Sequence, residues 1–167
     1  GGWGAGHNKD GVDVTGCVAN GETFNIPVEV KETKFGIRVE RYTFNDEQGG
    51  SGTFRGGRGM ILDYLITSDF ATLTTIFGRH RTPPWGLKGG YDGTCNYAKV
   101  IRTDGTEEVF GRTAGINLKK GDMVRLVTGG GGGYGDPRKR QREKVLEDIK
   151  NGFLTTTQAK TDYGIEI

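Results

Sequence analysis

Glycine content is the feature that most constrains how this chain can fold. It accounts for 31 of the 167 residues, against a usual share of about 7%. Each glycine costs a helix about 1 kcal/mol relative to alanine, so this density excludes a compact helical bundle. The glycines show no three-residue period and there are only 4 prolines, which excludes collagen. Because the net charge is only +2, we expect one folded unit with a modest core and many turns.

Segments rich in β-branched and aromatic residues predict strands through most of the chain. In residues 35–44, Phe35, Ile37 and Val39 alternate with small or polar residues, the pattern of a half-buried strand. Asp104-Gly105 separates two such segments and is typical of a hairpin turn. The expected strands are residues 23–30, 35–44, 60–66, 70–77, 94–102, 107–110 and 123–128, with 60–66 and 70–77 forming a pair.

The pattern changes after residue 136. Asp136 suits a helix N-cap and Pro137 suits the first helical position, and apolar residues then recur at helical spacing. We expect one helix over residues 137–151 and, after the capping box that begins at Thr155, a second over 156–163. The fold class is therefore mainly β, an antiparallel sandwich or barrel, with a C-terminal helical hairpin (α+β overall). Residues 1–136 form a glycine-rich β domain, and 137–167 a two-helix tail packed on it.

The charge balance, 23 basic against 21 acidic residues, favours no class of partner by itself. Cys17 and Cys95 form neither a disulfide framework nor a zinc-binding pair, which is typical of free thiols in a reducing compartment. No apolar run reaches the roughly 18 residues of a membrane span, and the longest is interrupted by Asp63. We expect no membrane and no nucleic-acid partner, since the second expected helix lacks a basic reading surface.

One glycine run resembles a nucleotide-binding loop. Gly130-x-Gly132-x-x-Gly135 follows a predicted strand and precedes a predicted helix, as in a dinucleotide fingerprint. Five consecutive glycines produce that pattern by chance, and the second parallel strand of a βαβ unit is missing. We therefore interpret residues 130–136 mainly as a structural or interface loop. Lining an active site, or contact with a phosphate at the helix N-terminus, remains an alternative.

Three clusters of cations have two interpretations each. Arg55-Gly56-Gly57-Arg58 and Arg79-His80-Arg81 could hold a carboxylate or phosphate, or could pair with acidic residues of another element. The run Arg138-Lys139-Arg140-x-Arg142 opens the expected helix, where cations oppose the helix dipole. Either it is a solvated face or it meets a negative group, which could be an acidic partner surface, a ligand phosphate or nucleic acid.

No self-contained catalytic or metal centre is predicted. The two histidines have no second ligand at metal-binding spacing, and neither serine lies in a GxSxG elbow. The candidate residues for a substrate or interface site are Arg55, Gly56, Gly57, Arg58, Arg79, His80, Gly130, Gly131, Gly132, Gly133, Tyr134, Gly135 and Asp136.

Several ordered motifs together resemble the C-terminal part of the hydantoinase B/oxoprolinase family. The resemblance covers nearly the whole chain, and the order and spacing of the motifs make it more specific than any single glycine loop. The motifs are Gly1-Gly2-Trp3-Gly4-Ala5 with Asp10-Gly11, Asn25-x-Pro27-x-Glu29-x-x-Glu32, the glycine run 49–59, residues 121–137 from Gly121-Asp122 to Asp136-Pro137, and the ending Val145-x-x-Asp148-Ile149-x-x-Gly152 with Ala159-x-x-x-Tyr163-Gly164.

The resemblance implies a part of a cytoplasmic hetero-oligomer. Members of the family open lactam or hydantoin rings with ATP, and relatives carboxylate ketones such as acetone and acetophenone. The implied partners are an ATP-using A-type subunit, the N-terminal part of the B-type subunit and a small-molecule substrate. ATP, Mg and a divalent metal are implied for the full complex, and none of them for this chain alone. The implied metal site lies in the N-terminal part, so no catalytic residue carries over to this sequence.

Overall fold

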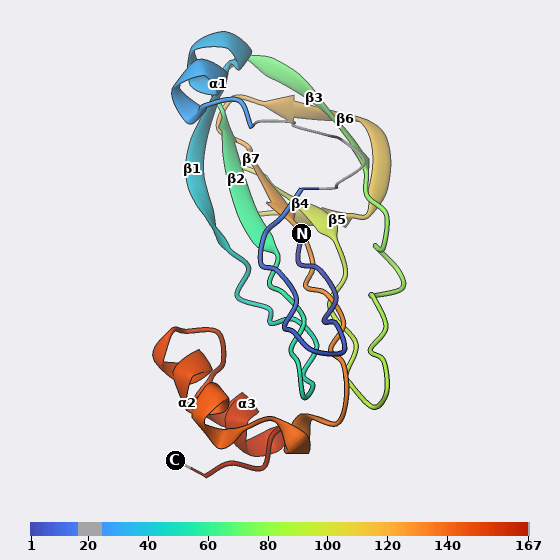
Figure 1. Ribbon diagram of the computed structural model, residues 1–167. Helices are drawn as coiled ribbons and strands as arrows, with labels where there is room; N and C mark the ends of the chain where they lie inside the picture. Colours follow the sequence, from blue (N-terminus) through green and yellow to red (C-terminus); the bar gives the residue numbers. More distant parts are fainter. Residues whose placement is uncertain (17–24, 167) are drawn as a thin grey trace.

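The computed structural model describes residues 1–16 and 25–166. The strands and α1 gather at one end of the molecule and α2 and α3 at the other, with long loops running between them (Figure 1). The elements are α1 (Val28–Phe35), β1 (Ile37–Phe44), β2 (Met60–Ile66), β3 (Phe70–Ile76), β4 (Tyr97–Ile101), β5 (Glu107–Phe110), β6 (Arg112–Lys119), β7 (Met123–Val127), a 3₁₀ helix (Pro137–Lys139), α2 (Arg142–Lys150) and α3 (Thr156–Thr161). The mainly β, α+β architecture predicted from the sequence is confirmed.

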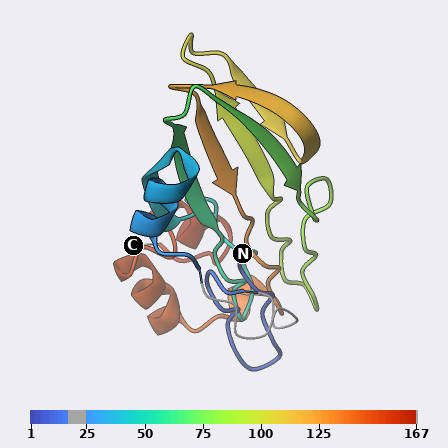
Figure 2. The ribbon, with the colours of Figure 1, turned by 90° about the horizontal axis from the view of Figure 1, so that it is seen from above.

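The strands form two antiparallel sheets that share one core. The larger sheet has the order β1-β2-β7-β4-β5, and β3 pairs with β6 in a second sheet that lies across it (Figure 2). Ile66, Val100, Leu118 and Val124 are buried between the sheets, because alternate residues of each strand face inward. Asp63 interrupts the apolar run of β2, since it pairs across the strands with Arg125 through two bonds of 2.8 Å.

Several strand predictions are confirmed and three are wrong. The Asp104-Gly105 hairpin joins β4 to β5 as expected. The expected pairing of 60–66 with 70–77 is wrong, because both edges of β2 are occupied by β1 and β7. The sequence pattern does not predict β6, since Gly115 at φ 72° interrupts its alternation.

The third wrong prediction is the strand over residues 23–30, of which Val28–Val30 belong to α1. Pro27 precedes this helix, and Gly36 ends it in the left-handed conformation. The Glu32 carboxylate accepts the backbone N–H of Val39 at 2.9 Å and so anchors the helix on β1. Thr23 and Phe24 of the expected strand lie outside the described residues, as does Cys17.

The C-terminal tail has two helical segments before α3, where the sequence predicts one continuous helix. Asp136 accepts the N–H of Arg138 at 2.9 Å and caps the 3₁₀ helix that starts at Pro137. Arg140 is then extended (φ −67°, ψ 134°), and α2 starts two residues later. The capping box at Thr155 is confirmed. The tail has a small core of its own, formed by Val145, Leu154, Ala159, Tyr163 and Ile165.

Candidate functional site in the glycine-rich loops

Residues 130–133 run through the middle of the loop region between sheets and helices. Their backbone is hydrogen-bonded to segments that are distant in sequence, as the adjacent paths of the loops in Figure 1 illustrate. The bonds are Gly131 N–H to Gly57 O (2.9 Å), Gly50 N–H to Gly131 O (2.8 Å), Ala5 N–H to Gly132 O (2.9 Å), Leu87 N–H to Gly133 O (2.9 Å) and Thr94 N–H to Gly130 O (3.2 Å). We call this arrangement the glycine bundle.

Hydrogen bonds in the glycine bundle recur at a spacing of three residues. Gly2 and Ala5 donate to Gly129 and Gly132, each pair three residues apart. Gly11 and Val14 likewise donate to Arg55 and Arg58. A period of three is that of the polyproline II helix, whereas a strand has a period of two. This difference explains why these extended segments pair side by side without forming strands.

Close backbone approach requires glycine at the centre of the bundle. A Cβ on Gly131 would overlap the Trp3 carbonyl oxygen, and one on Gly132 would overlap that of Trp85. Backbone atoms of other segments would likewise be met at Gly56, Gly57, Gly130 and Gly133. The bundle is therefore held by backbone hydrogen bonds and glycine packing, without an apolar interior.

The amide groups of residues 129–131 and 133–135 already have acceptors within the protein. Tyr134 exchanges two backbone bonds with Phe54, at 2.9 and 3.0 Å, and Gly135 donates to Leu87 O at 2.8 Å. The N–H groups of residues 129–131 and 133 also donate to protein oxygens. These groups do not point at an open phosphate-sized space, so the geometry favours the structural-loop interpretation.

A buried ion network joins the bundle to the tail. The Arg140 side chain is 1% exposed, bonded to both Asp10 oxygens at 2.7 and 2.8 Å and to Asp148 at 2.7 and 3.1 Å. It also donates to the Thr53 carbonyl at 3.1 Å. The interpretation of Arg140 as part of a solvated or docking face is therefore wrong, because its charge is neutralised inside the protein. Arg138, Lys139 and Arg142 of the same run are exposed.

Arg55 and Arg58 also serve the protein's own structure. Arg55 bridges Asp13 and Asp148, each at 3.2 Å, and lies 4.2 Å from the centre of the Phe153 ring. Arg58 donates to the carbonyl of Gly152 at the end of α2, at 2.8 Å. The geometry therefore supports pairing with acidic residues of other elements for Arg55, whereas the Arg58 side chain donates to backbone carbonyls.

The network fixes the ionisation of its members. Burial acts to raise the pKa of Asp10, but hydrogen bonds from Arg140 and the Arg55 N–H outweigh it, and the pKa is lowered. Burial likewise acts to lower the pKa of Arg140, and the two carboxylates outweigh it and raise that pKa. Both groups therefore stay charged at neutral pH, which suits a structural ion pair rather than proton transfer.

Arg79 and His80 lie away from this network. The Arg79 guanidinium stacks on Trp85, 4.6 Å from the ring centre. The His80 ring packs against Gly111, where a Cβ would overlap it, and its Nδ1 lies 3.0 Å from the Phe77 carbonyl. The structure thus brings Arg55–Arg58 together with residues 130–136, and places residues 79–81 on another side of the bundle.

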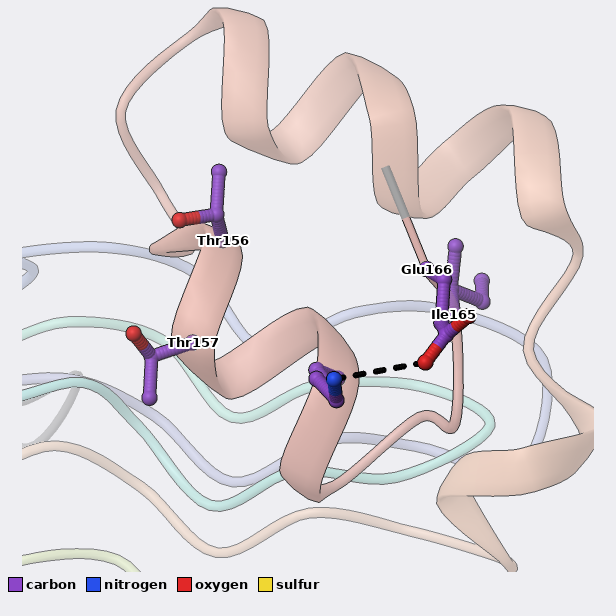
Figure 3. A pocket seen from close by; sticks show the side chains of 5 residues that line it. Thr156, Thr157, Ile165 and Glu166 are labelled. Atoms are coloured by element: carbon purple, nitrogen blue, oxygen red, sulfur yellow. Dashed lines mark ion pairs between the residues drawn. The ribbon is translucent and has the colours of Figure 1, made fainter.

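The remaining polar groups give no catalytic arrangement. Ser51 donates to Asp162 at 2.7 Å, with no histidine in the pair. Within residues 1–16 and 25–166, no three His, Cys, Asp or Glu side chains cluster to hold a metal. A hollow of about 510 Å³ beside α3 holds an exposed ion pair of Lys160 and Glu166, 3.3 Å apart (Figure 3). Its lining offers neither a nucleophile with a base nor a buried charge.

Comparison with known proteins decides the family. A sequence profile of the hydantoinase B/oxoprolinase family matches residues 1–137. The chain belongs to the hydantoinase B/oxoprolinase family. It is 34% identical, over its whole length, to the B-type subunit of a putative D-/L-hydantoinase from Pseudomonas sp. strain NS671. It is 32% identical, over 98% of its length, to the β chain of the caprolactamase of Pseudomonas jessenii. The resemblance drawn from the sequence motifs is confirmed.

Solved structures of larger proteins share this fold. The ATP-dependent caprolactamase of Pseudomonas jessenii matches 99% of the chain with a TM-score of 0.81 and 29% identity. The nucleotide-free acetone carboxylase matches 98% with a TM-score of 0.80, but at 22% identity it shows the fold alone. The chain spans 28% and 29% of the lengths of the matched hydantoinase and caprolactamase chains.

The sequence does not predict the acidic half of the ion network. In the sequence, Asp10 and Asp148 are noted only as members of the motifs that carry the resemblance. Both are partners of Arg140, from positions 130 residues and 8 residues away. The only local signal is an acidic residue on the apolar side of a helix, since Asp148 lies between Val145 and Ile149 on the face that packs inward.

Proposed function

We propose that this chain is the glycine-rich part of a B-type subunit in an ATP-dependent enzyme that opens cyclic amides. The similarity to the ATP-dependent caprolactamase, with a TM-score of 0.81 over 99% of the chain, carries the proposal. The identity to a hydantoinase chain of the B type supports the same class of substrate, because caprolactam and hydantoins both contain a cyclic amide.

In this assembly the chain forms a wall or an interface and contributes no reacting groups. Residues 1–136 form the glycine-rich β unit and 137–167 the tail that docks on it through Arg140 and Arg55. The loops that contain Gly56, Gly130–Gly133 and His80 form an active-site wall or a subunit interface. ATP, Mg and a divalent metal belong to the complete complex, with an A-type subunit that uses ATP and the rest of the B-type subunit.

The experiment is reconstitution with a choice of substrates. The chain is co-expressed with the A-type subunit and the remaining part of the B-type subunit encoded in the same genome. The assembly is then supplied with ATP, Mg and hydantoin, 5-oxoproline or caprolactam, and ADP and the ring-opened acid are measured together. We expect one cyclic amide to be opened with ATP consumption in step.

A parallel reaction separates the alternative functions. Acetone or acetophenone with labelled bicarbonate replaces the cyclic amide, and label fixed in a carboxylate identifies a ketone carboxylase. Carboxylation without ring opening would replace the proposed reaction by this alternative. An assembly that forms but turns over neither class would leave the chain as a non-catalytic assembly module, and absence of any assembly would reject the proposal.

A further inference from the structure

One outer segment of the glycine bundle carries large apolar side chains that the bundle cannot bury. Residues 84–91 lie at the outside of the loop region, in yellow-green in Figure 1. Trp85, Leu87 and Tyr91 are 60%, 49% and 48% exposed. Their backbone is fixed, since Leu87 donates to Gly133 O at 2.9 Å and Tyr91 to Ser51 O at 2.7 Å. The inner side of this segment is filled by backbone contacts, so the three side chains have no interior to turn into.

A basic hollow lies near Trp85. Arg79 connects the two, because its guanidinium stacks on Trp85 while the next residue, His80, lines the hollow. The hollow has a volume of about 410 Å³ and is also lined by Arg81, Phe110 and Arg112. Arg81 and Arg112 are exposed and form no ion pair with any described residue. We call Arg79, Arg81, Trp85, Leu87, Tyr91 and Arg112 the loop face.

The loop face has the composition of a protein interface. Exposed Trp, Tyr and Arg side chains on a rigid backbone are enriched at the centres of such interfaces. The matched relatives are more than three times as long as this chain, which covers 28% and 29% of them, and this additional polypeptide is the partner that we assign to the loop face.

We propose that the loop face is where the remaining part of a B-type subunit packs. The segment seated there presents apolar side chains to Trp85, Leu87 and Tyr91, and acidic side chains to Arg81 and Arg112. The inference rests on the proposed function, because it takes the partner from the same assembly. It gives residues 79–81 an interface role and separates them from the Arg55–Arg140 network, which is internal.

Binding between the chain and the separately produced remaining part of the B-type subunit tests this inference. The variants Trp85→Ala with Leu87→Ala, and Arg81→Glu with Arg112→Glu, are compared with wild type by calorimetry at two salt concentrations. Phe70→Ala is the matched control, since its side chain is 81% exposed and lies opposite Lys119 on β6, at the far end of the strand pair from Arg112. We expect Kd to rise at least tenfold for both loop-face variants and to stay within about twofold for the control.

Thermal unfolding of each variant shows whether it is folded, and the charge-reversed pair, whose positions are exposed, keeps the test valid if the Trp85 variant unfolds. Weaker binding of the wild-type chain at the higher salt concentration supports the charged half of the interface. If wild type binds and turns over substrate, and both loop-face variants bind as tightly as wild type, the interface role of the loop face is refuted and the proposed function stands. If wild type binds nothing, both proposals fall together.

Discussion

Removing the Arg140 guanidinium is expected to destabilise the protein strongly. Arg140→Met keeps much of the apolar stem but deletes the bonds to Asp10, Asp148 and Thr53. Breaking a buried ion pair by removing one partner typically costs 3–5 kcal/mol, because the other charge stays buried. Asp148 keeps Arg55 at 3.2 Å, and the Asp10 side chain is part-exposed. We therefore expect the lower end, about 3 kcal/mol.

Urea and thermal unfolding followed by circular dichroism measure this loss. For a chain of this length, about 3 kcal/mol corresponds to a fall in Tm of roughly 6–12 °C. The matched control is Arg138→Met, two residues earlier and exposed, for which we expect a change within about 0.5 kcal/mol. An Arg140→Met protein within about 1 kcal/mol of wild type would refute the reasoning that this network holds the tail on the bundle.

Three further outcomes follow from the described contacts. Gly131→Ala should destabilise by about 3 kcal/mol or more, because its Cβ overlaps the Trp3 carbonyl, whereas Gly78→Ala, with open space around it, should not; urea unfolding of the pair compares them. The lowered pKa of Asp10 means that the unfolded chain binds its proton first, so stability should fall as pH drops below the usual value of 3.8, with a shallower fall for Asp10→Asn in acid titrations. Thr155→Ala should cost about 1 kcal/mol by removing the α3 cap, and Thr156→Ala, which has no capping role, serves as its control; equal losses would contradict the capping argument.

Local sequence patterns predict those elements whose structure is determined by residues that are close together in the sequence. Alternation identifies β1, the Asp104-Gly105 pair identifies the β4–β5 hairpin, and Thr155 with Gln158 identifies the start of α3. In each case the residues that determine the structure are neighbours in the sequence. Motif order also identifies the family, because several spaced glycine motifs together are specific.

Long-range contacts explain what the sequence does not predict. The predicted partner of β2 is wrong because strand pairing is decided by which edges are free, and a strand's own residues do not record this. Val28–Val30 have β-branched residues typical of strands, yet contacts with β1 place them in a helix. The tail helix is interrupted at Arg140, which pairs with Asp10. Because Asp10 is 130 residues away, no local pattern predicts this interruption. For the candidate residues of the loops, the sequence indicates glycine packing but not which segments meet.

The most direct test of the account compares turnover by the chain alone with turnover by the reconstituted complex. ATP hydrolysis and ring opening of the accepted cyclic amide are measured for the isolated chain, for the complex lacking it, and for the complete complex. We expect ATP hydrolysis and ring opening only when all parts of the complex are present. Ring opening by the isolated chain, or undiminished turnover by the complex that lacks it, would contradict the claim that this glycine-built unit shapes a shared active site.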